Sequence, residues 1–248
     1  MKCTDLKILG IDFFNGSIAE SLKLANQGGL IVAPSGPGLA SDLIHCVNYE
    51  KSLTQADLVL PDSGLMCLFQ KLLNGQKIKR ISGLKFLKSY LENFVHEESS
   101  FWIMPNKSQY QANRSWLFNN HGFEINDEQS YCAPIYNKSG PIVDAQLLSK
   151  ISQMKPKTIF IQLGGGVQER LGLFLKKHLN YNPTILCTGA ALAFLSGEQV
   201  YIPKWADELY LGWLLRCFFN PKLYLPRYLK AFRLIFLLLK YGAKNPNL

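Results

Sequence analysis

At 248 residues the chain has room for one large domain, or for a domain with an appendage, and it can bury a substantial core. Hydrophobic residues make up 48% and charged residues 18%, which excludes a disordered protein. The net charge of +9 is unevenly placed, because the segment 211–248 carries seven basic residues and no acidic one. We therefore expect a negatively charged partner at that end, either phosphate-rich lipid or nucleic acid.

The six cysteines show no C-x-x-C spacing and lie mostly in apolar segments, so buried free thiols are favoured over a zinc site or a redox pair. The first residues lack an apolar stretch of signal-peptide length, which favours a cytosolic, reducing location. No run reaches the roughly 20 apolar residues that cross a bilayer. The most apolar run, 234–239, is bracketed by Arg233 and Lys240, so we expect a protein that lies on a membrane without spanning it.

Apolar runs alternate with helix-like segments over the first two-thirds of the chain, which is typical of a parallel-sheet α/β domain. Ser17 and Glu20 have the spacing of a capping box for the first helix. We expect strands at 8–11, 30–32, 56–60, 101–104, 131–136, 158–163 and 184–187. We expect helices at about 17–28, 41–54, 64–73 (buried), 83–94, 108–120, 143–153, 167–178 and 190–195.

The pattern changes after Pro203, where tryptophan, phenylalanine and leucine residues crowd together ahead of a basic, helix-prone segment at 226–240. No further strand-and-helix unit follows, and no low-complexity linker divides the chain. We therefore predict an α/β core at 1–202 and a C-terminal appendage at 203–248.

A helix through 226–240 places Arg227, Lys230 and Arg233 in a stripe beside aromatic and aliphatic residues. This composition is typical of an interfacial helix that inserts apolar groups and is attracted to anionic lipid. A helix that packs on the core and exposes a basic edge is the alternative. Nucleic-acid binding is not favoured, because nothing in the chain resembles a recognition module.

In open α/β sheets ligands bind at the carboxyl ends of the strands, so the loops at 34–38, 61–64 and 164–169 are the first candidates for a site. The triple glycine at 164–166 follows a strand and precedes a helix, where bare backbone lets a diphosphate approach the helix N-terminus. Gln168, Glu169 and Arg170 in the first helical turn are polar groups placed to meet a sugar nucleotide. A purely structural tight turn, with Glu169 complementing the helix dipole, is the alternative.

Asp62 follows the apolar run 56–60 and precedes Ser63, so its carboxylate is expected at the edge of the sheet, facing the same cleft. Such a carboxylate can act as a general base towards an acceptor hydroxyl. An Asx-turn or an N-cap for the following helix is the alternative. The chain contains no D-x-D pair, with which many sugar-nucleotide enzymes hold a divalent cation, so a metal-dependent mechanism is not favoured.

Four pieces of the chain follow one another in the order of the motifs of one family. They are Ala56 to Asp62, Gly164 to Glu169, Thr188 to Gly197, and a closing series of Pro203-x-Trp205, Leu211-Gly212-Trp213, Arg216, Pro221 and Arg227-Tyr228. Over most of the chain these pieces resemble the WecG/TagA/CpsF glycosyltransferases (glycosyltransferase family 26). The chain resembles a divergent member, because 33–35 replaces the usual T-x-N, Gly166-Val167 replaces Pro-Lys, and Gly212 replaces Glu.

The resemblance implies an inverting, metal-independent transfer of a hexose or N-acetylhexosamine from a UDP-sugar to a polyprenyl-diphosphate-linked sugar, in bacterial surface or exopolysaccharide synthesis. It implies no cofactor, and a cytoplasmic protein held peripherally on the inner face of the cell membrane. The implied fold is α/β, with a Rossmann-like, mostly parallel sheet, helices on both faces and a basic helical C-terminal appendage.

By position the resemblance makes Asp62 the catalytic base and Gln168 a donor-site residue. It places Arg216 and Arg227 in the appendage, which closes over the active site, where their forked side chains suit a diphosphate without a metal. No metal ligand is expected. The residues expected to bind substrate are Ser35, Gly36, Ser63, Gly164, Gly165, Gly166, Gln168, Glu169, Thr188, Gly189, Arg216 and Arg227.

The expected partners are the UDP-sugar, the lipid-linked acceptor and an anionic membrane surface, without nucleic acid; self-association into a homo-oligomer is left open. A non-catalytic sugar-nucleotide-binding subunit of a polysaccharide assembly complex is the alternative from another class, because the usual Thr, Asn and Lys positions are changed. A nucleotide-dependent oxidoreductase fits less well, since the triple glycine is not the G-x-G-x-x-G pattern of dinucleotide-binding folds.

Overall fold

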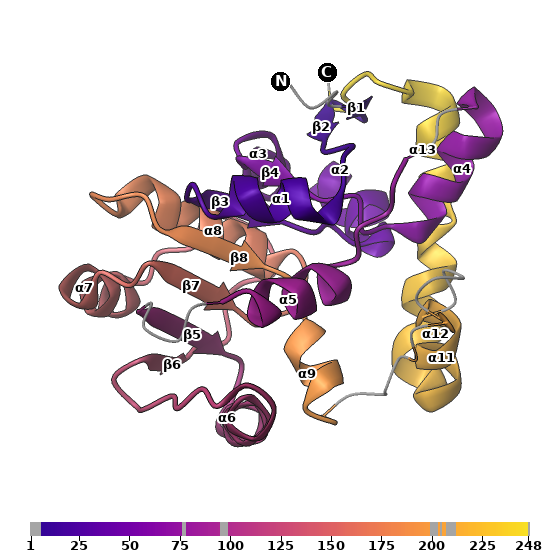
Figure 1. Ribbon diagram of the computed structural model, residues 1–248. Coiled ribbons are helices and arrows are strands. Elements are labelled where there is room, and N and C mark those ends of the chain that lie inside the picture. Colours follow the sequence, from indigo (N-terminus) through magenta and orange to yellow (C-terminus); the bar gives the residue numbers. More distant parts are fainter. Residues whose placement is uncertain are drawn as a thin grey trace.

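A computed structural model of the chain describes residues 6–75, 78–94, 99–198, 203, 205–206 and 212–247. Its centre is a six-stranded sheet in the order β4-β3-β8-β7-β5-β6, in which every pairing is parallel. Along the sequence, the strands of one edge come first (β3 and β4), those of the other edge follow (β5 and β6), and the two central strands come last (β7 and β8; Figure 1). The strands are β3 (Gly29–Val32), β4 (Leu58–Val59), β5 (Ser100–Met104), β6 (Ser130–Cys132), β7 (Thr158–Ile161) and β8 (Thr184–Cys187).

Helices cover both faces of this sheet, which confirms the predicted fold class (Figure 1). The Ser17–Glu20 capping box is present, since the Ser17 N–H donates to Glu20 Oε2 (2.7 Å) and the Glu20 N–H donates to Ser17 Oγ (3.3 Å). One face carries α3 (Val47–Thr54), α7 (Ala145–Met154) and α8 (Val167–His178), and the other carries α1 (Ile18–Ala25), α5 (Gly83–Glu92), α6 (Lys107–His121) and α9 (Ala191–Leu195).

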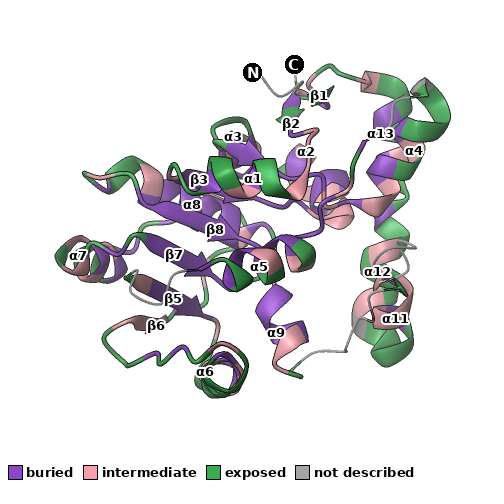
Figure 2. Cartoon of the chain, viewed as in Figure 1, coloured by how far each residue is buried: buried purple, intermediate pink, exposed green. Residues whose placement is uncertain are grey.

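Successive residues of a strand belong to different hydrophobic clusters, because side chains alternate between the two faces of a sheet. In β7, Ile159 and Ile161 pack with α7 and α8, whereas Phe160 packs with α5 and α9. The central strands are therefore buried along their length, as Figure 2 shows. Burial on both faces explains why their sequences are unbroken apolar runs.

Two predicted elements in the first 54 residues are split where the backbone turns. The strand predicted at 8–11 is wrong, because β1 (Leu6–Ile8) and β2 (Ile11–Phe13) form an antiparallel hairpin. Its two turn residues, Leu9 (φ 51°) and Gly10 (φ 79°), both have the positive φ that matches the twist of paired strands. The helix predicted at 41–54 is also interrupted, since the π-helical turn η1 (Gly38–Asp42) and the short α2 (Leu43–His45) precede α3.

The described segment 212–247 forms three helices, and the single helix expected over 226–240 is broken at Phe232. The helices are α11 (Gly212–Phe219), α12 (Pro221–Ala231) and α13 (Arg233–Tyr241). The Phe232 N–H donates to the Leu229 carbonyl (3.3 Å) and its own carbonyl accepts from the Ile235 N–H (3.0 Å), so the helical turn tightens to three residues there. Within the ranges described above, no helix is long and apolar enough to cross a membrane.

The inner side of α13 belongs to the core. Leu234, Leu237 and Leu238 are at most 3% exposed and lie in the same hydrophobic cluster as residues of β3 and β8. On the outer side, Phe236 and Leu239 are 59% and 61% exposed. α13 therefore packs on the core, as expected from the alternative to an interfacial helix. It also presents an apolar surface to solvent.

The end of the chain is fastened to its beginning. The carbonyls of Gly242 and Ala243 accept hydrogen bonds from the N–H groups of Leu9 (2.9 Å) and Gly10 (3.0 Å). Figure 1 accordingly shows the C-terminal end beside the β1–β2 hairpin. The domain boundary predicted between 1–202 and 203–248 lies outside the described residues and stays a prediction.

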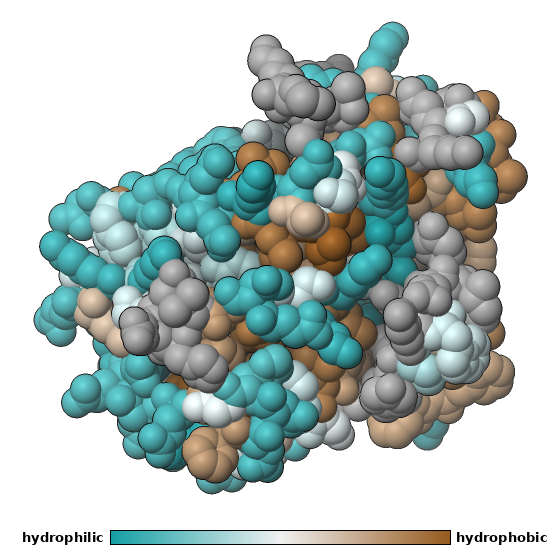
Figure 3. All heavy atoms as spheres, viewed as in Figure 1, coloured by the Kyte–Doolittle hydropathy of each residue, from teal (hydrophilic) through white to brown (hydrophobic). Residues whose placement is uncertain are grey.

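The helix predicted at 64–73, α4 (Gly64–Asn74), is buried on one side only. Met66 and Cys67 are 0% and 3% exposed, whereas Leu72 is 73% exposed. α4 packs beside α13, and hydrophobic atoms gather along this side of the molecule (Figure 3). The expectation of a buried helix holds for one side only, because apolar residues occupy both sides of α4.

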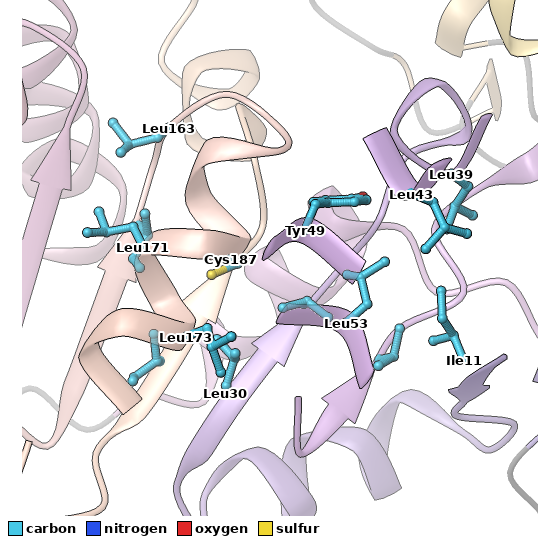
Figure 4. Packing of buried hydrophobic residues seen from close by; sticks show 14 of the residues in the cluster. Ile11, Leu30, Leu39, Leu43, Tyr49, Leu53, Leu163, Leu171, Leu173 and Cys187 are labelled. Atoms are coloured by element: carbon cyan, nitrogen blue, oxygen red, sulfur yellow. The ribbon is translucent and has the colours of Figure 1, made fainter. Parts of the chain in front are cut away.

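The α8 helix lies close against the sheet because Gly172 has no side chain. A Cβ at Gly172 would stand 2.6 Å from Leu30 Cδ1 and 2.9 Å from Cys187 Sγ. Figure 4 shows Leu30 and Cys187 next to Leu171 and Leu173 of α8. This close approach fixes the N-terminus of α8, and the triple glycine before it, at the carboxyl edge of the sheet.

The prediction of buried free thiols is confirmed for most of the cysteines. Cys46, Cys67, Cys187 and Cys217 are buried and free, whereas Cys132 is free and exposed. Cys3 lies outside the described residues.

Candidate active site

The loops after β3 and β4 meet the tail helices around one cleft. A Cβ at Gly36 would lie 3.1 Å from Ser63 Oγ, so the two strand-end loops touch on the core side. Six predicted site residues line this cleft: Ser35, Gly36, Asp62, Ser63, Arg216 and Arg227. The other lining residues are Pro37, Gly64, Leu65, Leu68, Arg80, Gly212, Trp213, Tyr228, Ala231 and Phe232.

Asp62 is held at the cleft by contacts with the start of α5. Its Oδ1 accepts a hydrogen bond from the Gly83 N–H (3.0 Å), and Arg80 Nη2 lies 4.0 Å from the same oxygen. The N-cap of α4 is Ser63, whose Oγ accepts from the Met66 N–H (3.3 Å). Asp62 is therefore not the N-cap of α4, and its side chain, 25% exposed, remains partly open to the cleft.

Arg80 was not predicted from the sequence. Its Nε donates to the Asp62 carbonyl at 2.8 Å, and its side chain is 17% exposed and lines the cleft. It stands 18 positions from Asp62, in no recognisable motif. Only the fold brings the two residues together.

The triple-glycine turn approaches both the first strand-end loop and the tail. Gly164 and Gly165 are exposed, and a Cβ at Gly165 would lie 3.7 Å from Arg227 Nη2 and 3.9 Å from Ser35 Oγ. Gly166 has a φ of 86°, in the left-handed region that favours glycine, and is the N-cap of α8. The turn therefore presents bare backbone next to a guanidinium group and a hydroxyl.

Two contacts fix the guanidinium group of Arg216, one with an aromatic ring and one with a hydroxyl group. Its guanidinium lies over the Phe194 ring at 4.3 Å from the ring centre, and Nη1 donates to the Tyr228 hydroxyl (3.1 Å). Its Nε is buried without a hydrogen-bond partner in the described part of the chain. Stacking on an aromatic ring orients the fork of an arginine while leaving its edge for an anion.

Gln168 and Glu169 lie beneath the triple-glycine turn, with side chains 2% and 1% exposed. The Gly189 N–H donates to Gln168 Oε1 (2.7 Å), and Gln168 Nε2 donates to Glu169 Oε1 (3.0 Å). The Gly166 N–H donates to Glu169 Oε2 (2.7 Å). This chain of bonds ties the turn after β7 to the turn after β8. It supports a positioning role, and direct substrate contact by this pair stays a prediction.

The burial of Glu169 predicts how stability depends on pH. Desolvation raises the pKa of this carboxyl from 4.5 to about 7, against the opposing effect of the hydrogen bonds that it accepts. Between these values the folded protein keeps a proton that the unfolded chain has lost, so stability falls as the pH rises from about 4.5 to about 7 and is level above that.

We expect the contribution of Glu169 to the free energy of unfolding to fall by about 3 kcal/mol over this pH range. Urea unfolding at about pH 5 and about pH 8 measures the change. The variant Glu169→Gln has no proton to lose and should show a flatter profile. Identical pH dependence in the two proteins would contradict the assignment to Glu169.

Two buried polar atoms at the ends of β7 and β8 have no partner within the residues that the structure describes. They are Gln162 Nε2 and Thr188 Oγ1, in side chains 3% and 6% exposed. Ile161 pairs with Cys187 in register, so the two residues leave the sheet side by side. A buried donor without an acceptor is costly, so we expect a water or a ligand atom there. Gln162 was not predicted as a site residue, although a polar residue directly after an apolar strand could have indicated it.

The charges of the cleft suit an anion. Arg80, Arg216 and Arg227 line it together with Asp62 as the acidic residue of the described lining. Guanidinium groups bind phosphate oxygens through paired N–H donors. Among the described residues no group of three or more His, Cys, Asp or Glu side chains is placed to hold a metal ion.

Comparison with known proteins gives this arrangement its context. The sequence profile of the glycosyl transferase WecG/TagA/CpsF family matches residues 6–247 of the chain. The chain belongs to this family. Its predicted membership is thus confirmed, and with it the prediction that the protein is a glycosyltransferase.

Two relatives of known name align with most of the chain. A Bacillus subtilis protein is 23% identical over 194 residues, which cover 78% of this chain and 73% of the relative. A Bacillus spizizenii protein is 22% identical over 219 residues, which cover 86% and 82%. Both are named N-acetylglucosaminyldiphosphoundecaprenol N-acetyl-beta-D-mannosaminyltransferase.

Proposed function

We propose that this family member transfers a hexose or N-acetylhexosamine from a UDP-sugar to a polyprenyl-diphosphate-linked sugar in the synthesis of a bacterial surface polysaccharide. The observation that carries the proposal is the single cleft in which Asp62 meets Arg80, Arg216 and Arg227. The names of the two relatives support an acceptor on undecaprenyl diphosphate.

The reaction follows from the placement of these groups. Asp62 takes the proton of the acceptor hydroxyl as that oxygen attacks the anomeric carbon, and direct displacement of UDP inverts the configuration. Arg216 and Arg227 bind the diphosphate as negative charge develops on the leaving group, which makes a metal ion unnecessary. The exposed backbone of Gly164 and Gly165, before the N-terminus of α8, offers N–H groups to the same diphosphate.

A transfer assay tests the proposal directly. The purified protein is incubated with a panel of UDP- and GDP-sugars and with N-acetylglucosamine on polyprenyl diphosphate, with and without EDTA, and the products are identified by mass spectrometry. We expect transfer from a UDP-sugar at a rate that EDTA does not change. Donor binding without transfer would favour the non-catalytic sugar-nucleotide-binding subunit, and loss of transfer in EDTA would contradict the metal-independent mechanism.

The tail supports a peripheral position on the inner face of the cell membrane. The described segment 212–247 carries basic residues and no acidic one, and it exposes Phe218 (76%), Phe219 (68%) and Phe236 (59%). Aromatic insertion together with attraction to anionic lipid holds such a surface on a bilayer. We expect sedimentation with anionic vesicles that weakens as salt is added. Equal partition onto neutral and anionic vesicles would contradict the electrostatic part.

A further inference from the structure

The lining of the cleft is of two chemical kinds. Asp62 and the arginines are charged, whereas an apolar rim consists of Leu65 and Leu68 of α4 and of Ala231 and Phe232 at the junction of α12 and α13. Leu68 and Phe232 are 46% and 51% exposed, so this rim is open to the surface. A substrate with a charged head and an apolar chain fits such a cleft in one direction only.

The apolar character continues outward from this rim along two helices. Leu72 and Leu73 of α4 are 73% and 47% exposed, and Phe236 and Leu239 of α13 are 59% and 61% exposed. The two helices pack beside each other, and the hydrophobic atoms on this side are visible in Figure 3. Monomeric proteins rarely expose apolar residues so densely unless the surface binds a partner.

The charges around this surface select the partner. Lys71 lies in the last turn of α4, and Arg233 and Lys240 lie on α13. Neither helix contains an acidic residue. Cations that flank an apolar face are attracted to the headgroups of anionic lipid.

We infer that α4 is a second membrane-binding element beside the tail, and that the isoprenoid chain of the acceptor leaves the cleft between Leu68 and Phe232 to enter the bilayer. The inference rests on the proposed function, since it takes the acceptor to be a diphosphate on an isoprenoid chain. With the diphosphate at the arginines, the chain runs past Leu65 and Ala231 into the apolar surface, so the enzyme need not lift its substrate out of the membrane.

The experiment compares two acceptors with the same diphosphate-linked N-acetylglucosamine. One carries a full polyprenyl chain in phosphatidylglycerol-containing vesicles, and the other carries a short, water-soluble alkyl chain. We expect Leu68→Ser to lower kcat/KM about tenfold for the long chain. The short chain does not reach the apolar surface, so we expect its loss of kcat/KM to be smaller than that of the long chain by about fivefold or more.

A second variant tests the surface without the reaction. Leu72→Ser should reduce binding to the same vesicles about tenfold, because a leucine that inserts into lipid is lost. Ile135→Ser is the matched control, since Ile135 is 102% exposed and lies in the loop after β6. It should change neither vesicle binding nor transfer.

Each outcome decides between the two proposals. If unmodified protein transfers to neither acceptor, the proposed function fails and this inference falls with it. If transfer is normal but Leu68→Ser slows both acceptors equally, or Leu72→Ser binds vesicles as well as the unmodified protein, the inference is wrong and the transferase stands. If sedimentation velocity shows that the unmodified protein is a dimer and that Leu72→Ser only converts it to a monomer, the surface is a dimer interface and the inference is again overturned.

Discussion

Replacing Asp62 with asparagine is expected to lower kcat for sugar transfer by about 100- to 10,000-fold, the usual contribution of a general base. Asparagine keeps the shape of the side chain and an oxygen that accepts the hydrogen bond that the Gly83 N–H donates to Asp62 Oδ1 at 3.0 Å. The fold should therefore be preserved, while the group that takes the acceptor proton is lost. The measurement is kcat at saturating donor and acceptor, with the melting temperature recorded for both proteins.

Asp12→Asn is the matched control for this substitution. Asp12 pairs with Lys7 in the β1–β2 hairpin, and its side chain is 59% exposed, so the same chemical change there should leave kcat unaltered. Undiminished transfer by Asp62→Asn would show that another group takes the proton. A large fall in melting temperature would instead assign Asp62 to the anchoring of α5.

Replacing Arg227 with glutamine is expected to lower kcat/KM by about 100-fold, in line with removing one preorganised donor from a site of developing charge. Arg227 belongs to the tail, yet its Nη2 would lie 3.7 Å from a Cβ at Gly165, at the triple-glycine turn. It also interacts electrostatically with Asp42 of η1, where it opposes the rise that burial causes in the pKa of that carboxyl. Its charge therefore acts inside the cleft.

Lys230→Gln removes the same charge one turn further along α12, where the side chain is exposed. We expect this control to weaken vesicle binding by a few-fold, at about 1 kcal/mol per basic residue near an anionic surface, and to leave transfer to a soluble acceptor unchanged. Arg227→Gln should instead leave vesicle binding unchanged and lower the rate of transfer to the soluble acceptor. If both variants weaken vesicle binding equally and neither changes transfer to the soluble acceptor, Arg227 binds the membrane surface and not the diphosphate.

The parts of the fold that were predicted correctly are those in which local sequence and tertiary structure agree. β8 and α8 lie at the predicted residues, because an unbroken apolar run and a following glycine turn leave one interpretation. The β1–β2 hairpin was missed because Leu9 takes a positive φ inside an apolar run, and only Gly10 signals the turn. The one-sided burial of α4 depends on where α13 packs, which no local pattern contains.

The candidate site divides in the same way. Asp62 and the triple glycine could be predicted because both follow strands, and parallel strands bring their carboxyl ends to one edge. Arg80 could not, since its place depends on how the chain returns to α5. The burial of Gln168 and Glu169 beneath the turn could not be predicted either, because it depends on how the turn after β8 packs against α8. Their contact with substrate stays a prediction.

The bonds between Gly242 and Leu9, and between Ala243 and Gly10, bear on how the protein is made. Because Leu234, Leu237 and Leu238 complete the main hydrophobic cluster, the core cannot close until they have emerged from the ribosome. Contacts between such distant parts of a chain form late in folding. A nascent chain halted before α13 lacks Gly242 and Ala243 as well as the three leucines, so we expect a truncated product to leave this core incomplete.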